Sequence, residues 1–156
     1  MTNEAGHDAL VLDALPGHYI RRLQQIAVAI FLEETDEYSI TPVQYAALNT
    51  VSATPDIDQR SLATAIGFDT STIGGVIDRL EARELVRRTP SPTDKRQRLL
   101  RLTPKGKKLL VQVEPLVQRA QQRMLAPLPK NERAQFMKML RQLVLANNTH
   151  SRAPKT

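Results

Sequence analysis

Apolar residues recur every three or four positions along most of the chain, which predicts a mainly helical protein. A first helix is expected over residues 16–34, where the repeat forms one apolar stripe. That stripe consists of Ile20, Leu23, Ala27, Ile30 and Phe31. A second helix is expected to begin at the capping-box sequence Thr41-Pro42-Val43-Gln44 and to end at Pro55.

Two shorter helices follow, and a glycine separates them. Asp58 is suited to cap the first, and Gly67 stands where a left-handed residue ends a helix. Asp69 or Thr70 caps the second, whose apolar residues are Ile73, Val76, Ile77 and Leu80. Two short helices joined by a tight turn containing glycine form the helix-turn-helix pattern.

The next segment changes to strand-like alternation. Residues 85–88 are predicted to form one strand, and Pro90 begins a loop because proline cannot continue a paired strand. Residues 98–102 form the returning strand, and Lys95 and Arg96 lie at the tip between them. One face of the returning strand carries Arg98, Leu100 and Leu102. A hairpin directly after a helix-turn-helix is a wing.

Two helices are expected to complete the chain. Thr103-Pro104 opens a long helix, which Pro115 is expected to bend. Its apolar stripe is Leu109, Val113, Leu116, Ala120 and Met124. Pro127 and Pro129 break the chain, and fraying is expected from about Asn148. The last helix carries Phe136, Met139, Leu140, Leu143 and Val144.

The pattern predicts a single domain, residues 1–156, that is mainly α with a small β-hairpin wing. The winged helix-turn-helix spans about residues 41–102, and dimerisation helices at about 16–35 and 104–147 flank it. A single chain offers these flanking helices little to bury against, so we expect two copies to pair as a homodimer.

Composition limits the chemistry. The chain is 41% apolar and has no cysteine, which excludes a disulfide scaffold, a thiolate zinc site, a cysteine nucleophile and a thiol redox switch. The longest apolar run, residues 26–32, is far shorter than the roughly 20 residues of a membrane helix. Because the N-terminus shows no signal-peptide pattern, we expect a soluble cytoplasmic protein with no membrane partner.

Charge is segregated along the chain. Residues 1–58 carry nine acidic and two basic residues, whereas residues 83–108 carry ten basic and two acidic residues. A basic cluster of this kind suits a polyanion, because neutralised phosphates release their counterions. A solvated basic surface is the alternative.

The outward face of the helix after Asp69 is built from small residues, namely Ser71, Thr72, Gly74 and Gly75. A glycine inside a helix costs roughly 1 kcal/mol relative to alanine. Two in a row suit a helix whose backbone approaches another surface closely, such as the floor of a DNA major groove. Tight packing against another helix is the alternative. Arg79, further along, is expected to reach a phosphate or a base.

The tip of the wing supplies a second contact. Arg96 is expected to enter the adjacent minor groove, where narrow A·T tracts have the strongest negative potential. Asp94 is expected to hold the Arg96 guanidinium through a charge-assisted bond, and closing the turn alone is the alternative. General phosphate contacts are expected from Arg87, Arg88, Lys95 and Arg98. The full set of predicted DNA contacts is Arg60, Thr70, Ser71, Thr72, Gly74, Gly75, Arg79, Lys95, Arg96 and Arg98.

Five motifs together resemble the MarR family of bacterial transcriptional regulators. They are Leu62-Ala63 with Thr70-Ser71-Thr72, Val76-Ile77-Asp78-Arg79-Leu80-Glu81, Leu85-Val86-Arg87-Arg88, Ser91-Pro92-Thr93-Asp94-Lys95-Arg96 and Leu102-Thr103-Pro104-Lys105-Gly106. The resemblance, over about residues 16–147, implies a dimeric winged helix-turn-helix repressor that binds a pseudo-palindromic DNA duplex and is released by a small phenolic or aromatic acid. It implies recognition by Thr70, Ser71, Thr72, Gly74 and Gly75 and a wing pair of Asp94 and Arg96.

A candidate effector site lies in the N-terminal third. An aromatic acid needs a cation for its carboxylate and apolar walls for its ring, which His18, Arg22, Tyr38 and Tyr45 offer. Residues 15–25 resemble regulators of aromatic-acid catabolism, which implies a hydroxybenzoate- or hydroxynicotinate-like ligand. The alternative is that the tyrosines are core residues and that an arginine of this segment pairs across the dimer with Glu33, Glu34 or Glu37.

No catalytic, metal or cofactor site is predicted. The histidines His7, His18 and His150 are scattered, and no H-E-x-x-H, phosphate-loop or G-x-S-x-G motif is present. We therefore predict a sequence-specific DNA-binding regulator, a repressor released by an aromatic acid, and not an enzyme. The alternative is a winged-helix module for protein or RNA contacts without ligand control.

Overall fold

The computed structural model describes residues 9–151. Its helices are α1 (Pro16–Glu34), α2 (Pro42–Ala53), α3 (Gln59–Ile66), α4 (Thr70–Ala82), α5 (Pro104–Leu125) and α6 (Lys130–Ala146). Its strands are β1 (Ile57–Asp58), β2 (Val86–Pro90) and β3 (Arg98–Leu102). Short 3-10 turns lie at Leu12–Ala14, Asp36–Tyr38 and Asn148–His150. In this part of the chain no helix has the length and apolar character needed to cross a membrane.

The prediction that the chain frays from about Asn148 is wrong for the first three residues of that segment. Residues 148–150 form a turn, in which the His150 N–H donates to the Asn147 carbonyl at 3.0 Å. His7 and residues 152–156, which the sequence interpretation also used, lie outside the described residues.

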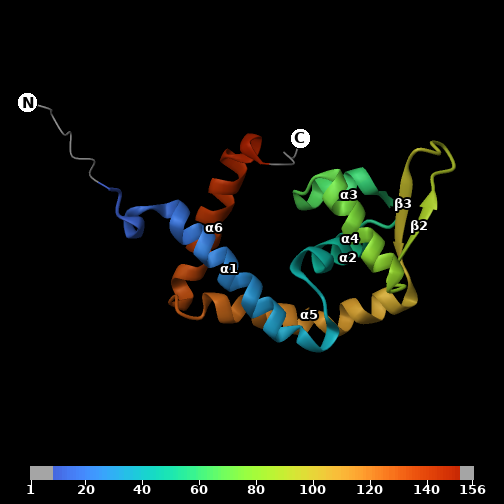
Figure 1. Ribbon diagram of the computed structural model, residues 1–156. Coiled ribbons are helices and arrows are strands. Elements are labelled where there is room, and N and C mark those ends of the chain that lie inside the picture. The colour runs from blue at the N-terminus through green and yellow to red at the C-terminus, as the bar shows by residue number, and fades with distance from the viewer. Residues whose placement is uncertain (1–8, 152–156) are drawn as a thin grey trace, which may run out of the picture.

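Helix α5 connects the two parts of the molecule (Figure 1). Next to its N-terminal end, residues 40–102 fold into a lobe of α2, α3, α4 and the three strands, which we call the compact lobe. Further along, α1 lies against α5, and α6 follows after a turn. We call α1 and α6 the terminal helices.

The predicted caps start each helix of the compact lobe. Thr41 and Gln44 form the capping box of α2, with both side chain-to-backbone hydrogen bonds at 3.2 Å. Asp58 caps α3 and Asp69 caps α4, each accepting from the backbone N–H three residues further on, at 2.8 and 2.7 Å. Gly67 ends α3 with a φ of 77°, a conformation that favours glycine. These local signals confirm the predicted helix-turn-helix.

The three strands form an antiparallel sheet in the order β1-β3-β2. The sequence pattern does not predict β1, in which Ile57 pairs with Leu100, because two residues carry no periodicity. The prediction that the first wing strand ends before Pro90 is wrong, since Pro90 pairs with Arg98 at the end of β2. β2 is an edge strand, where a proline without an N–H leaves the ladder intact.

One apolar core joins the compact lobe to α5 and to the end of α1. Its fully buried members include Ile40, Leu48, Leu62, Ile73, Ile77, Leu80, Leu85, Leu100 and Val113. The buried stripe of α5 is broader than predicted, because Leu110 and Val117 are also buried, while Leu116 and Met124 are half-buried. The reason is that α5 is covered by α1 on one side and by the compact lobe on another. The helix continues through Pro115, and the bend there stays a prediction.

Gly106 lets α5 begin against the turn between α4 and β2. A Cβ atom added at Gly106 would lie 2.1 Å from the carbonyl oxygen of Leu85. Thr103 fixes the same junction, because its Oγ1 accepts from the Gly106 N–H at 3.0 Å and its own N–H donates to Leu85 at 3.1 Å. The start of α5 is therefore held in close contact with the end of α4.

The terminal helices leave much of their apolar surface uncovered. α6 has no buried residue, and in α1 only Phe31 is buried. The exposed apolar residues include Tyr19, Ile20, Leu23, Ile26 and Leu32 of α1 and Met137, Met139, Leu143, Val144 and Leu145 of α6. The apolar stripes predicted for these two helices lie on helix faces, but the rest of the same chain does not cover those faces.

Candidate nucleic-acid interface

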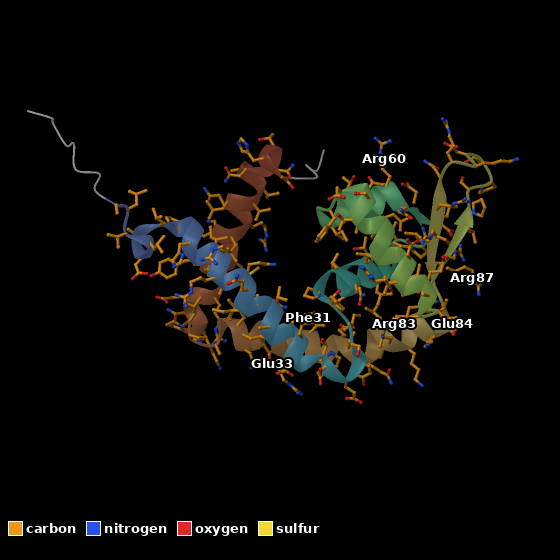
Figure 2. The ribbon with its side chains drawn as sticks, viewed as in Figure 1. Phe31, Glu33, Arg60, Arg83, Glu84 and Arg87 are labelled. Carbon is orange, nitrogen blue, oxygen red and sulfur yellow. The ribbon has the colours of Figure 1, made fainter. Side chains whose placement is uncertain are left out.

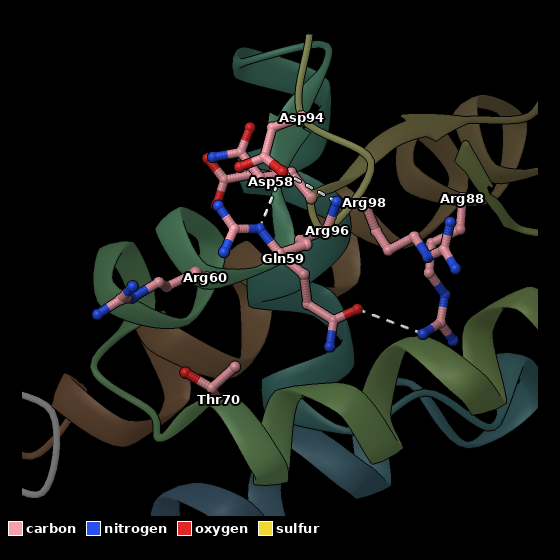
Figure 3. Close-up of a pocket in the computed structure, with 9 residues that line it drawn as sticks. Asp58, Gln59, Arg60, Thr70, Arg88, Asp94, Arg96 and Arg98 are labelled. Atoms are coloured by element: carbon pink, nitrogen blue, oxygen red, sulfur yellow. Dashed lines mark hydrogen bonds and ion pairs between the residues drawn. The ribbon is translucent and has the colours of Figure 1, made fainter. Parts of the chain in front are cut away.

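A basic groove lies between α3, the start of α4 and the wing (Figure 3). Its volume is about 540 Å³. It is lined by Asp58, Gln59, Arg60, Thr70, Arg88, Asp94, Arg96, Gln97 and Arg98. Four predicted DNA contacts, Arg60, Thr70, Arg96 and Arg98, are thus brought together from α3, α4 and the wing. We call this feature the groove.

Asp69 organises the hydroxyl groups at the start of α4. The Ser71 hydroxyl donates to one carboxylate oxygen of Asp69 at 2.8 Å, and the Thr72 hydroxyl donates to the other at 2.8 Å. Both side chains are exposed, as is Thr70. With their protons directed to Asp69, the two hydroxyls present oxygen lone pairs outward, which suits a base amino group.

The two glycines of α4 have different surroundings. A Cβ atom added at Gly75 would meet nothing within 4 Å, so internal packing does not require glycine there. A Cβ atom added at Gly74 would lie 3.3 Å from Nε2 of Gln59, so the packing alternative applies to Gly74. The open space at Gly75 leaves the helix backbone accessible to an external surface.

Ser91 and Asp94 hold the loop of the wing. The buried Ser91 hydroxyl accepts from the N–H groups of Thr93 and Asp94, both at 3.3 Å. Asp94 Oδ1 accepts from the Arg96 N–H at 3.0 Å and from its Nε at 3.3 Å. Asp94 therefore closes the turn and also holds the guanidinium, so both interpretations of the sequence apply. The Arg96 side chain is 92% exposed at the tip.

The other predicted cations are exposed, with one exception. The exposed ones are Arg60, Arg79, Arg87, Lys95 and Arg98. Figure 2 shows Arg60 and Arg87 extending away from the ribbon. The prediction that Arg88 contacts phosphate is wrong, because its side chain, only 19% exposed, forms ion pairs with Asp78 and Glu81. The packing of β2 on α4 turns this guanidinium inward.

Two residues of the interface have no clear sequence signal. Gln59 lines the groove, and Ser91 builds the wing loop. Both are neutral, and neither belongs to an apolar stripe. Their positions in the sequence are the one available signal of a role in the interface. Gln59 directly follows the helix cap Asp58, and Ser91 lies between two prolines.

The structure does not bring the four predicted effector contacts together within one chain. His18 and Arg22 lie in the first half of α1, whereas Tyr38 and Tyr45 lie beyond its last residue. Tyr45 packs on Phe31, nine residues after Arg22, which at 1.5 Å per residue is roughly 14 Å further along α1. The His18 ring instead contacts its sequence neighbours: Arg21 Nη2 lies 3.2 Å from Nδ1, and the Tyr19 ring centroid lies 5.7 Å from that of His18.

Tyr38 and Tyr45 are half-buried and pack against the core. The Tyr45 ring centroid lies 6.2 Å from that of Phe31. Burial, with a smaller contribution from the negative charge of Glu114, raises the pKa of the Tyr45 hydroxyl. The two tyrosines therefore make contacts with the core, as the alternative interpretation of the sequence predicts.

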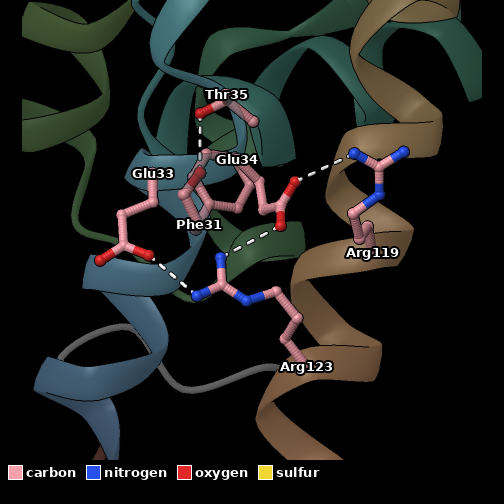
Figure 4. A network of polar contacts seen from close by, with 6 residues as sticks. All are labelled: Phe31, Glu33, Glu34, Thr35, Arg119 and Arg123. Carbon is pink, nitrogen blue, oxygen red and sulfur yellow. Dashed lines mark hydrogen bonds and ion pairs between the residues drawn. The ribbon is translucent and has the colours of Figure 1, made fainter.

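The acidic residues at the end of α1 have partners on α5 of the same chain (Figure 4). Glu33 pairs with Arg123 at 2.9 Å, and Glu34 pairs with Arg123 at 3.0 Å and with Arg119 at 3.5 Å. Within one chain, Glu33 and Glu34 thus have partners on α5, and pairing with an N-terminal arginine across a dimer stays a prediction. These ion pairs tie the end of α1 to α5.

Known proteins share both the sequence pattern and the fold. The model of the MarR family matches residues 40–97. The HTH-type transcriptional repressor NicR of Pseudomonas putida is 30% identical, over 82% of this chain and 81% of its own length. The structure of Bordetella bronchiseptica BpsR, whose DNA binding is regulated by 6-hydroxynicotinic acid, matches 86% of this chain and 96% of its own, with 29% identity and a TM-score of 0.81. The repressor CouR, bound to a 23-mer DNA duplex, matches 88% of this chain and 99% of its own, with 30% identity and a TM-score of 0.81.

Proposed function

Because this chain belongs to the MarR family of winged-helix transcriptional regulators, we propose that it is an aromatic-acid-responsive repressor. It binds a pseudo-palindromic operator as a homodimer, the assembly that the family forms. A small aromatic carboxylate of the hydroxybenzoate or hydroxynicotinate class releases it. Its target is chromosomal DNA, so it acts in the cytoplasm.

The observation that carries the DNA-reading part is the groove beside α4. Three exposed arginines, Arg60, Arg96 and Arg98, line it, and the exposed start of α4 lies at its edge. In the proposal, α4 enters a major groove with Gly75 toward the bases, and Arg96 enters the adjacent minor groove. The exposed apolar faces of the terminal helices pair across the two-fold axis and set the distance between the two α4 helices.

Replacing Arg96 tests this assignment. Arg96→Ala is expected to weaken operator binding by roughly 1–3 kcal/mol, because it removes a cation from a desolvated groove contact. The operator is first recovered by selecting genomic fragments, and affinity is then measured by fluorescence anisotropy. Lys138→Ala on α6 removes the same charge away from the groove and controls for net charge. A loss of a few tenths of a kcal/mol would make Arg96 a screened surface charge.

The ligand class rests on relatives and on four side chains. BpsR is regulated by 6-hydroxynicotinic acid, and the site we propose contains His18, Arg22, Tyr38 and Tyr45. Arg22 binds the carboxylate, and the tyrosines flank the ring. Because one chain separates the two pairs along α1, the site is completed across the dimer. This explains why an exposed cation such as Arg22 lies next to the apolar face of α1.

The structure contains a connection from this region to α4. The Arg83 guanidinium, just after α4, donates to the carbonyl oxygens of Tyr38 and Ser39, both at 2.9 Å. Ligand binding beside Tyr38 therefore acts on a segment that is bonded to the end of the recognition helix. Release requires that the ligand bind more tightly to a dimer whose α4 helices are wrongly spaced for DNA.

Titration of the operator complex with 4-hydroxybenzoate and 6-hydroxynicotinate tests the ligand. Either acid is expected to weaken operator binding at least tenfold, and 4-hydroxybenzyl alcohol, which lacks the carboxylate, is expected to have no effect. Arg22→Gln should keep operator affinity and lose the response. If no acid of this class weakens binding, the ligand proposal is wrong while DNA binding stands.

Salt dependence separates DNA reading from the alternative of protein or RNA contacts. Operator affinity is expected to fall steeply with salt and to exceed affinity for random duplex by several kcal/mol. Equal binding to operator and random duplex would favour the alternative.

A further inference from the structure

Arg88 links the wing to both helices of the helix-turn-helix. Its guanidinium pairs with Asp78 and Glu81 on α4 and donates to Gln59 Oε1 on α3 at 3.3 Å. Its backbone N–H also donates to Glu81 at 3.2 Å. Because Asp78 and Glu81 neutralise the Arg88 guanidinium, this side chain is not available to bind a phosphate. Its contact with Gln59, a neutral side chain in the groove, is therefore the one that bears on DNA.

Arg88 fixes which end of the Gln59 amide is left without a partner in the described chain. A guanidinium has only N–H donors, so the amide atom that it contacts is the oxygen. The Nε2 group, with two donors, is the end of the amide that does not face Arg88 (Figure 3). It lies close to Gly74, where an added Cβ would be 3.3 Å from it. Among residues 9–151, Gln59 Nε2 has no hydrogen-bond partner.

Gly74 makes room for this orientation. A Cβ atom at position 74 would lie 3.3 Å from Nε2, so a larger residue would press on the amide. The amide therefore rests on the glycine stretch of α4, which is the part of the helix expected to approach the bases. Its position combines a fixed orientation with access to the major groove.

We propose that Gln59 reads a guanine in each operator half-site and that Arg88 is its positioning residue. A free glutamine reads adenine with both ends of its amide, donating to N7 and accepting from the N6 amino group. Gln59 has its acceptor occupied by Arg88, so only its donors reach the DNA. Guanine presents two acceptors, N7 and O6, on its major-groove edge, whereas adenine presents one acceptor and one donor. The inference rests on the operator binding proposed above.

A library of operators, randomised one base pair at a time, tests this assignment with four variants of the full-length protein. Gln59→Ala is expected to reduce the preference for guanine at one position of each half-site by about tenfold. Arg88→Met releases the amide, so the preference at that same base pair should move toward adenine. Arg88→Met combined with Gln59→Ala should behave as Gln59→Ala alone. Lys108→Met, at an exposed cation of α5 that does not line the groove, should leave every preference unchanged.

Gln59→Glu keeps the inference testable if Arg88→Met does not fold. A carboxylate still accepts from Arg88 and replaces the outward donors with an acceptor, so the preference should move toward cytosine. If Gln59→Ala, Arg88→Met and Gln59→Glu lower affinity equally for all sequences, Gln59 reads no base and the inference is overturned. If the wild-type protein prefers no sequence at all, the proposed function fails instead.

Discussion

The compact lobe and the terminal helices show the same apolar periodicity, but only one of them satisfies it within a single chain. In the compact lobe, the stripes of α2 and α4 are buried, including Leu48, Ile73 and Leu80. On the terminal helices, comparable residues such as Ile20 and Leu143 stay more than half exposed. The apolar pattern of the compact lobe is therefore satisfied when one chain folds. The apolar pattern of the terminal helices needs a further surface to cover it.

This division has a consequence for regulation. The surface that we propose to read DNA is assembled inside one chain, through the helix caps, the wing loop and the ion pairs of Arg88. In the proposed dimer, the distance between two such surfaces depends on the terminal helices, whose exposed apolar faces pair with those of a second copy. A ligand bound at the terminal helices can therefore change the spacing of the readers without unfolding either of them.

The largest expected effect comes from opening the core of the compact lobe. Leu80 of α4 is fully buried, so Leu80→Ala should lower the free energy of unfolding by about 2–5 kcal/mol. The loss combines less apolar burial with a cavity beneath the recognition helix. Urea denaturation, followed by circular dichroism, measures it. A loss below about 1 kcal/mol would mean that this lobe is not the stable unit of the chain.

The second effect tests the junction between the compact lobe and α5. Gly106→Ala should cost roughly 1–3 kcal/mol, because the new methyl group meets the Leu85 backbone, which cannot rotate away. Gly17→Ala, on α1, is the matched control, since a Cβ there meets nothing within 4 Å. The control should be neutral or slightly stabilising, because alanine favours helix over glycine. Equal stability of the two variants would show that the junction is loose.

Sequence reasoning succeeded where the signal is local. The caps at Thr41, Asp58 and Asp69 were predictable because each side chain bonds a backbone group three residues away. The Asp94–Arg96 contact was predictable for the same reason, since the two residues are two apart. Local signals also gave the helices and most of the wing.

The same reasoning failed where a contact joins distant segments. Arg88 lies 10 residues from Asp78 and 29 from Gln59, and its pairing depends on how β2 packs on α4. The basic character of its segment favoured a phosphate contact instead. The effector residues show a further limit, because the site we propose is completed by a second copy, and the spacing of residues in one sequence does not show such a site.

The third effect addresses the terminal helices. Leu143→Asp should raise the dimer dissociation constant by roughly 10- to 100-fold, because it removes apolar burial and adds a charge at the pairing face. Sedimentation velocity over a dilution series measures the dissociation constant. Phe68→Ser, at an exposed apolar residue of the compact lobe, is the control and should leave dimerisation unchanged. If Leu143→Asp dimerises normally, this face of α6 is not the interface.

The smallest effect is expected from an exposed ion pair at the base of the wing. Asp56 accepts two hydrogen bonds from Arg101, at 2.6 and 2.5 Å. These hydrogen bonds lower the pKa of the Asp56 carboxyl in the folded state. Because the folded pKa lies below the unfolded value, the pair stabilises the protein above the unfolded pKa, and this stabilisation is lost as the pH falls through the folded pKa.

Asp56→Asn should therefore be slightly less stable than wild type near neutral pH, and the difference should shrink as the solution is acidified. Urea midpoints measured between about pH 7 and pH 3 follow the difference across the range of carboxyl titration. Salt near 1 M, where the Debye length is about 3 Å, should also reduce it, because both side chains are partly exposed. Glu132→Gln, on α6, removes an exposed carboxylate outside the compact lobe as a control. A pH-independent difference would mean that the charge of Asp56 is not its cause; backbone strain is excluded as a cause, because the φ of 66° at position 56 suits asparagine as well as aspartate.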